Sequence, residues 1–292
     1  MLLVFFIVSN TIYAQSTDSL LKVVSKEKSP VLQFQLWAQI AYIYAQNNND
    51  SGNAYASQKL LSAAFVSRND TLIAGAYSFL GANAEDKGDF DHALEYDFKA
   101  LQIAEAMNFK YAICQTAEQI AVVYKQLKNV KETLRFLRKA EAFLSLPEIR
   151  EGLLRRAVYT NTAEIFLADK QTDSALVYAQ KANEVTKKEN DVFGYSRILL
   201  EFGQIYSEKG ENDLDETYFK KGITFCDTAC ESLNLISTLY EYSRHLLKNN
   251  QPQLAKFYAL RSLAEHNKFR NRAGTLSIEI TDILSRVYSS LK

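Results

Sequence analysis

Apolar residues recur along this chain at the spacing of amphipathic helices, and the clearest example lies in residues 74–103. Two runs of apolar positions three and four residues apart stand there, separated by a short polar stretch. This spacing places each run on one face of a helix. The first run contains Tyr77, Leu80, Gly81 and Ala84, and the second contains Phe90, Ala93, Leu94, Phe98 and Leu101. The pattern predicts two helices that pack against each other as a hairpin.

The polar stretch between the two runs has the residues of a tight turn between helices. Gly88 can adopt the left-handed conformation that ends a helix. Asp89 follows it and can cap the next helix by accepting hydrogen bonds from its first amides. Gly81 and Ala93 are small, which allows the two helices to cross closely.

The same signature recurs about every 40 residues along the chain. Units begin near residues 34, 74, 114, 156, 196 and 236, and a half-repeat begins at residue 278. Residues 16–33 predict an N-terminal capping helix ahead of the first unit. A single hairpin cannot bury its own apolar face and must stack on the next one. We therefore expect an all-α fold over residues 34–292, with six helical hairpins and a terminal helix.

The unit resembles the tetratricopeptide repeat (TPR). The resemblance rests on the Leu80-Gly81 pair, the turn at residues 88–90, and the small residues Ala93 and Ala100. It implies a right-handed α-α superhelix whose concave groove is lined by the first helix of each repeat. The period is longer than the usual TPR unit. In this it resembles the sensor domain of the maltose-regulon activator and the exported TPR sensor regions of Bacteroidetes-type regulators.

The resemblance also implies which positions face the groove. In the first helix of each unit these are the second, fifth, sixth, ninth and twelfth positions. The residues on that register are polar, with a few aromatic side chains, and suit a protein or peptide ligand. A row of glutamates among them favours a basic segment. The predicted groove residues are Gln39, Tyr42, Phe79, Glu85, Gln115, Glu118, Gln119, Thr160, Asn161, Glu164, Arg197, Glu201, Gln204, Tyr240, Glu241 and Arg244.

Composition and motifs exclude several classes of function. Lys+Arg and Asp+Glu both number 34, so the formal net charge is zero and nothing favours nucleic acid as a partner. His92, His245 and His266 fall at unrelated points of their repeats, whereas a metal site needs converging ligands. No nucleophile elbow, phosphate loop or zinc-protease motif occurs. We predict a non-enzymatic protein without cofactor or metal.

Residues 1–15 have the pattern of an export signal. An apolar run over residues 2–8, too short to span a bilayer, precedes a small residue at Ala14 where a signal peptidase would cut. No Lys or Arg stands before the run, which departs from the usual signal. We expect an exported, periplasmic protein. The alternative is a cytoplasmic protein whose first 15 residues form a helix packed on the first repeat.

Cys226 and Cys230 lie close together near the end of a predicted second helix. In an exported protein they can close a small disulfide. The alternative is that both are small residues of the core.

Two functional hypotheses follow from these patterns. The first is a scaffold that holds a protein or peptide in the groove. The second is the sensory TPR region, or a fragment, of a membrane-bound signal-transduction or transcription regulator. The half-repeat at the C-terminal end would leave Leu284 and Tyr288 uncovered, which predicts self-association through that end.

Overall fold

The computed structural model describes residues 16–147, 149, 152–229, 233–268 and 274–291. Over these ranges the regular structure is helical, as expected, and no strand occurs. The chain divides into two compact units, residues 1–150 and 151–292, and each is described by itself. Within the described ranges, no helix combines the length and the apolar character that crossing a membrane requires. The predicted signal, residues 1–15, lies outside the described residues.

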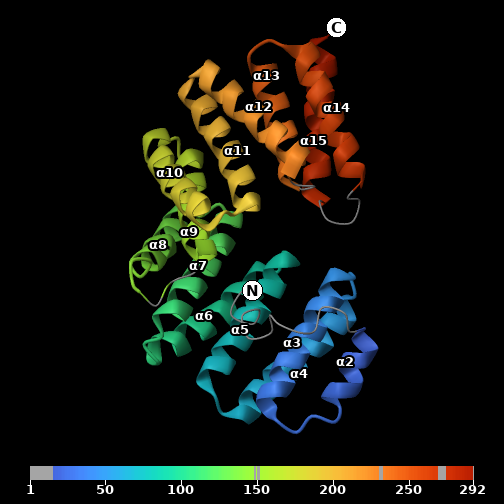
Figure 1. Cartoon of the computed structure of the whole chain (residues 1–292), viewed down its shortest axis with the longest axis vertical. Helices are drawn as coiled ribbons and strands as arrows, with labels where there is room; N and C mark the ends of the chain where they lie inside the picture. The colour runs from blue at the N-terminus through green and yellow to red at the C-terminus, as the bar shows by residue number, and fades with distance from the viewer. Residues whose placement is uncertain (1–15, 148, 150–151, 230–232, 269–273, 292) are drawn as a thin grey trace. The chain divides into compact units, whose positions relative to one another are not determined.

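Unit 1 is a short leading helix followed by three hairpins, coloured blue to green in Figure 1. The leading helix α2 packs on α3, and the pairs α3–α4, α5–α6 and α7–α8 form the hairpins. The helices are α2 (Thr17–Val24), α3 (Pro30–Gln46), α4 (Asp50–Ser67), α5 (Asp70–Asp86), α6 (Phe90–Ala106), α7 (Lys110–Gln126) and α8 (Val130–Glu141).

Unit 2 repeats the arrangement with three further hairpins and one last helix (Figure 1). The pairs α9–α10, α11–α12 and α13–α14 pack as hairpins, and α15 packs on both helices of the last pair. The helices are α9 (Gly152–Ala168), α10 (Thr172–Glu189), α11 (Val192–Lys209), α12 (Asn212–Ala229), α13 (Leu233–Lys248), α14 (Pro252–Lys268) and α15 (Gly274–Ser290).

The turn chemistry expected from the sequence is confirmed in the α5–α6 hairpin. Gly88 has φ +74°, the left-handed conformation, and Asp89 is the N-cap of α6. The Asp89 carboxylate accepts a hydrogen bond from the His92 amide at 3.3 Å. Asparagine performs the same task as Gly88 elsewhere, for example at Asn190 with φ 52°. The short asparagine side chain tolerates this conformation, so the chain makes tight turns with few glycines.

Close helix crossing is also confirmed, through the small residues. A Cβ added at Gly81 of α5 would collide with the carboxylate of Asp97 on α6. Ala93, Ala175 and Ala255 stand at one equivalent position in three second helices, and all are fully buried. Small side chains therefore set the distance between the two helices in these three hairpins.

The last helix completes the core of unit 2. Ile280, Ile283 and Val287 of α15 pack in the same cluster as Tyr242 of α13. Leu284 belongs to this cluster and is only 8% exposed, so the expectation that it would be uncovered is wrong. The reason is that α15 turns this side of its surface toward α13 and α14.

Candidate binding groove on the first helices of unit 2

The first helices of unit 2 lie next to one another. α9 contacts α11, α11 contacts α13, and α13 contacts α15. Each of the first three is followed by a second helix that packs on it, so one face of the first helix points away from its hairpin partner. Side chains on this face come from separate repeats but share one surface.

A cavity of about 420 Å³, here called the acidic cavity, opens on this surface. It gathers four glutamates and one arginine, together with polar and apolar side chains. Six of the predicted groove residues line it, namely Glu164, Arg197, Glu201, Gln204, Tyr240 and Glu241. The other lining residues are Leu167, Ala168, Leu200, Asn234, Ser237, Leu276 and Glu279.

The charges of the acidic cavity are partly balanced within the protein. Arg197 forms an ion pair with Glu164, joining α11 to α9. Burial raises the pKa of Glu241, and nearby Glu279 raises it further, whereas Arg244 and the Gln204 side chain oppose this shift. The lining has more carboxylates than cations, so its potential favours positive ligand groups.

A second cavity of about 290 Å³, here called the basic cavity, shares part of this wall. It carries three cationic side chains, two lysines and an arginine, against two glutamates. Its lining residues are Leu167, Ala168, Lys170, Gln204, Ser207, Glu208, Phe219, Glu241, Arg244, His245 and Lys248. The predicted groove residue Arg244 therefore lies at this cavity rather than at the acidic one.

Ser207 and His245 line the basic cavity and are here called its floor. Asp215 adjoins His245, but the three residues do not form a catalytic triad. Ser207 Oγ lies 2.9 Å and Asp215 Oδ2 lies 3.2 Å from the same ring nitrogen, His245 Nδ1. A nucleophilic serine must instead contact the nitrogen opposite the one that faces the aspartate. That nitrogen, Nε2, is 2.9 Å from the Asn249 amide. The amide nitrogen can only donate, so Nε2 accepts and the ring proton stands on Nδ1. Nδ1 therefore has no free lone pair with which to take a proton from Ser207.

The pair His245–Asp215 is buried, with 7% and 0% of each residue exposed. Burial lowers the pKa of His245, and the neighbouring Asp215 opposes that shift. Burial likewise raises the pKa of Asp215, and His245 opposes it. Both shifts favour the uncharged forms, so the floor of the cavity carries little charge while the cations stand at its rim.

The predicted groove residues of unit 1 lie on α3, α5 and α7. Ser78 donates a hydrogen bond to Gln119 Oε1 at 2.6 Å, which links α5 to α7. Burial raises the pKa of Glu85 to about 7, and the charges of Asp86 and Glu118 add to this effect. Phe79 and Gln115 are buried, and the remaining predicted residues Gln39, Tyr42, Glu85, Glu118 and Gln119 are half-buried.

Some positions of unit 2 assigned to the groove are buried in the structure. Thr160, Asn161 and Glu201 are 3%, 8% and 2% exposed. Glu201 still lines the acidic cavity, whereas Thr160 and Asn161 line neither cavity. A register drawn on a single helix does not take the neighbouring elements into account.

The sequence register missed several lining residues. Glu279 stands at the second position of the half-repeat, so extending the register to α15 would have found it. Lys170 follows α9 in a turn, with φ 60°, and no helical register includes it. The predicted partner of Cys226, Cys230, lies outside the described residues, and Cys226 itself is buried.

The chain resembles a known phosphatase over part of its length. No family model matches the chain. It is 23% identical over 175 residues to response regulator aspartate phosphatase I of Bacillus subtilis (strain 168). The match covers 58% of this chain and spans 43% of that protein.

Solved structures match over nearly the whole chain. The apo form of RapI aligns with a TM-score of 0.69 at 14% identity, covering 92% of this chain and 98% of that one. A signal transduction ATPase with numerous domains from Pyrococcus horikoshii, which has a tetratricopeptide repeat sensor, aligns with a TM-score of 0.64 at 14% identity. This alignment covers 95% of this chain and 44% of that one. The fold is TPR-like. At these identities the likeness shows the fold alone.

Proposed function

We propose that this chain is a non-enzymatic scaffold that binds a protein or peptide segment along the first helices of unit 2. The observation that carries the proposal is the acidic cavity, to which α9, α11, α13 and α15 all contribute. A surface built from successive repeats suits an extended ligand better than a compact one. The mixture of polar and apolar lining residues suits a peptide backbone with anchoring side chains.

The ligand class proposed for this surface is a basic segment. Four glutamates against one arginine attract positive side chains and speed their association. Tyr240 adds an aromatic surface next to Glu241, and such residues commonly anchor bound chains. The lining favours a lysine or arginine side chain flanked by apolar residues that contact Leu167, Leu200 and Leu276.

The absence of catalysis is part of the proposal, since the relative in Bacillus subtilis is named a phosphatase. Ser207 and Asp215 share one nitrogen of His245, an arrangement that does not activate a nucleophile. We expect the chain to leave the lifetime of an aspartyl phosphate on a response regulator unchanged. Accelerated loss of radiolabelled phosphate would contradict this part of the proposal.

A second candidate function is a sensory region of a larger regulator. It is supported by the likeness to the Pyrococcus horikoshii structure, which is described as having a tetratricopeptide repeat sensor. The proposed likeness to exported Bacteroidetes-type sensors belongs with this candidate. Here binding in the groove would be the input, and the output would lie in another domain or chain.

Export remains part of both candidates. The pattern of residues 1–15 supports cleavage after Ala14. Measuring the intact mass of the protein isolated from its own cells distinguishes a periplasmic from a cytoplasmic location. A mass that includes residues 1–14 would favour the cytoplasmic alternative.

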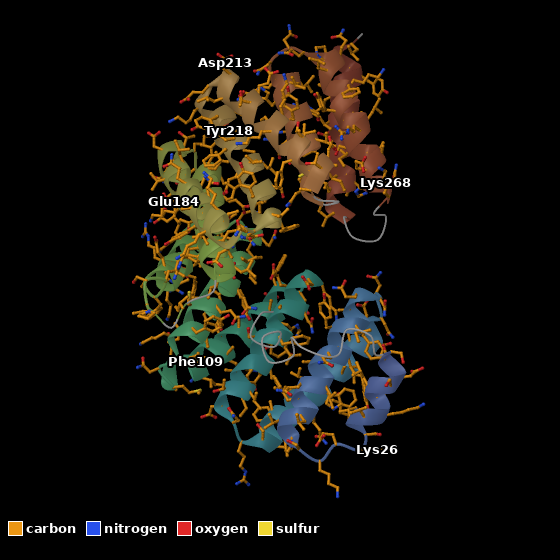
Figure 2. The ribbon with its side chains drawn as sticks, viewed as in Figure 1. Lys26, Phe109, Glu184, Asp213, Tyr218 and Lys268 are labelled. Atoms are coloured by element: carbon orange, nitrogen blue, oxygen red, sulfur yellow. The ribbon has the colours of Figure 1, made fainter. Side chains whose placement is uncertain are left out.

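The binding proposal is tested with peptides selected on the wild-type chain from a random display library. Their dissociation constants are then measured by fluorescence anisotropy for the wild type and for the Tyr240→Ala and Glu279→Gln variants. Glu184→Gln is the matched control, because Glu184 is exposed at the outer edge of α10 (Figure 2). We expect each cavity variant to weaken binding about ten-fold. Equal constants for all four proteins would overturn the proposal.

A further inference from the structure

The acidic and basic cavities form parts of one surface. Leu167 and Ala168 of α9, Gln204 of α11 and Glu241 of α13 line both. A ligand that fills one cavity therefore lies against the wall of the other. An extended segment can occupy both at once, because the two share this wall.

The two cavities differ in charge. The acidic cavity has three more carboxylates than cations, whereas the basic cavity has one more cation than carboxylates. Glu241 stands between them and pairs with Arg244 at 3.4 Å. The charge of Glu241 at the wall between the two cavities is thus balanced by Arg244. The surplus carboxylates lie on the acidic side of this wall and the surplus cation lies on the basic side.

Within the basic cavity, most charges also have partners. Lys170 pairs with Glu208 at 3.3 Å, and Arg244 pairs with Glu241. Lys248 has no carboxylate within ion-pair distance among the described residues. It is exposed on the last turn of α13, one turn beyond Arg244. Its ammonium group is the cation of this cavity that remains available to a ligand.

The floor of the basic cavity does not compete for an anion or repel it. His245 is held by Ser207 and Asn249, and its buried ring lies against Phe219. The positive potential therefore comes from the rim. A ligand carboxylate can reach Lys248 without entering the buried floor.

We propose that the groove is bipolar and fixes the direction of its ligand, with a basic side chain in the acidic cavity and an acidic side chain beside Lys248. The inference rests on the proposed binding function and adds the second subsite and its specificity. Attraction at both ends, and repulsion when the segment is reversed, would select one orientation.

The test uses synthetic peptides with blocked termini, so that no terminal charge contributes. One set carries a lysine followed by a glutamate at a series of separations, and a second set carries the same residues in the reverse order. A third set has the lysine alone. Dissociation constants are measured by fluorescence anisotropy at low and high salt. We expect one order to bind about ten-fold tighter than the other and than lysine alone, with the preference shrinking at high salt.

A charge exchange assigns the preference to Lys248. The Lys248→Glu variant should bind the peptide with lysine and glutamate no tighter than the peptide with lysine alone. It should bind more tightly a peptide in which a second lysine replaces the glutamate. Lys188→Glu is the control, since Lys188 is exposed in the last turn of α10 and lies outside both cavities. Circular dichroism establishes that both variants fold.

The outcomes separate this inference from the function on which it rests. If lysine peptides bind but the glutamate has no effect in either order, the bipolar groove is wrong and the binding function stands. The same conclusion follows if Lys248→Glu behaves like Lys188→Glu. If no peptide of any set binds, the proposed function fails and this inference fails with it.

Discussion

Asp97 is a carboxylate at a position that otherwise belongs to the core. It is the eighth residue of α6 and 1% exposed, and the equivalent residues in the other second helices are Ser57, Leu137, Ala179, Phe219 and Ala259. Its Oδ1 has no hydrogen-bond partner among the described residues. Burial raises the pKa of Asp97 to about 8, and the nearby Glu85 and Glu118 add to the shift. The carboxyl is therefore held mostly neutral at pH 7.

The raised pKa of Asp97 makes stability depend on pH. Below pH 3.8, the pKa of this group in the unfolded chain, Asp97 is protonated in both the folded and the unfolded states. As pH rises toward about 8 only the unfolded state loses the proton readily, so the free energy of unfolding falls. We expect Asp97→Asn to raise the free energy of unfolding at about pH 8 by roughly 2–4 kcal/mol and to change it little at about pH 4. Denaturant titrations at both pH values measure this. Equal gains at the two pH values would contradict it.

His245 and Asp215 also replace core residues of the repeat. Ile165 and Ile205 stand at the position of His245, whereas Ala175 and Ala255 stand at that of Asp215. We expect His245→Ile alone to destabilise unit 2 by about 1–3 kcal/mol, because it leaves the buried carboxyl group of Asp215 without its polar neighbour. Adding Asp215→Ala should recover most of the loss. Thermal or urea unfolding of the single and double variants gives the coupling, and purely additive effects would show that the pair does not act together.

At the scale of the helices, the second helix of each hairpin carries a cationic side chain at its tenth residue. The six are Lys59, Lys99, Lys139, Lys181, Lys221 and Arg261. Lys59, Lys99, Lys181 and Lys221 lie over tyrosine rings, for example Lys181 at 4.3 Å from the Tyr178 centroid. Lys139 and Arg261 instead pair with a carboxylate near the end of the preceding second helix. The cation therefore serves to join aromatic or acidic neighbours, which explains its recurrence.

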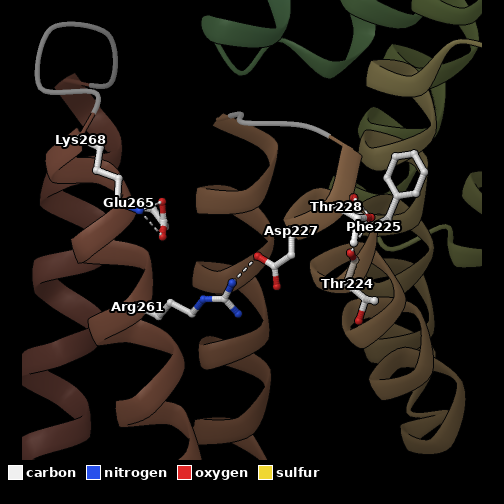
Figure 3. Close-up of polar contacts among 7 residues, drawn as sticks. All are labelled: Thr224, Phe225, Asp227, Thr228, Arg261, Glu265 and Lys268. Carbon is white, nitrogen blue, oxygen red and sulfur yellow. Dashed lines mark hydrogen bonds and ion pairs between the residues drawn. The ribbon is translucent and has the colours of Figure 1, made fainter.

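The ion pair of Arg261 on α14 with Asp227 on α12 is the clearest of these links (Figure 3). Both side chains are about one third exposed, which limits the stabilisation. We expect Arg261→Ala and Asp227→Ala each to cost about 0.5–1 kcal/mol and to show a coupling of about 0.5 kcal/mol. Lys268→Ala is the control, because its partner Glu265 lies on the same helix. A coupling near zero in urea unfolding would show that the pair does not link the two helices.

Self-association through α15 remains a prediction, now resting on a smaller surface. Tyr288 is 44% exposed and carries Lys256 over its ring, and Ile278 is 73% exposed. We expect Ile278→Asp to shift any dimer to monomer, since a charge on that face opposes burial. Sedimentation velocity across a range of concentrations measures the change. A dimer that persists in the variant would place the contact elsewhere.

At the scale of the whole chain, periodicity was sufficient to predict the fold. Residues such as Gly88 and Asp89 determine local geometry, so their roles could be inferred from the sequence alone. The packing of α15 could not, because whether Leu284 is covered depends on the angle at which that helix meets α13 and α14. A register drawn on one helix also ignores its neighbours. It therefore placed Thr160 in the groove, although this residue is buried.

The candidate site was predicted only in part for the same reason. Six side chains on the predicted register converge on the acidic cavity because equivalent positions of adjacent first helices lie side by side. The basic cavity depends on a turn residue, Lys170, and on a helix end, Lys248, which periodicity does not describe. The buried His245–Asp215 pair was detectable by comparing equivalent positions of the repeats, where charged residues stand out among alanine and isoleucine.

The proposed function requires a ligand to lie on the first helices of unit 2. Hydrogen–deuterium exchange with mass spectrometry, with and without a bound basic peptide, locates that ligand, because protection is measured for each segment. We predict slowed exchange in α11 and α13, with smaller effects in α9 and α15 and no change in α10, α12 and α14. Protection confined to the second helices, or absent from unit 2, would contradict the proposed function.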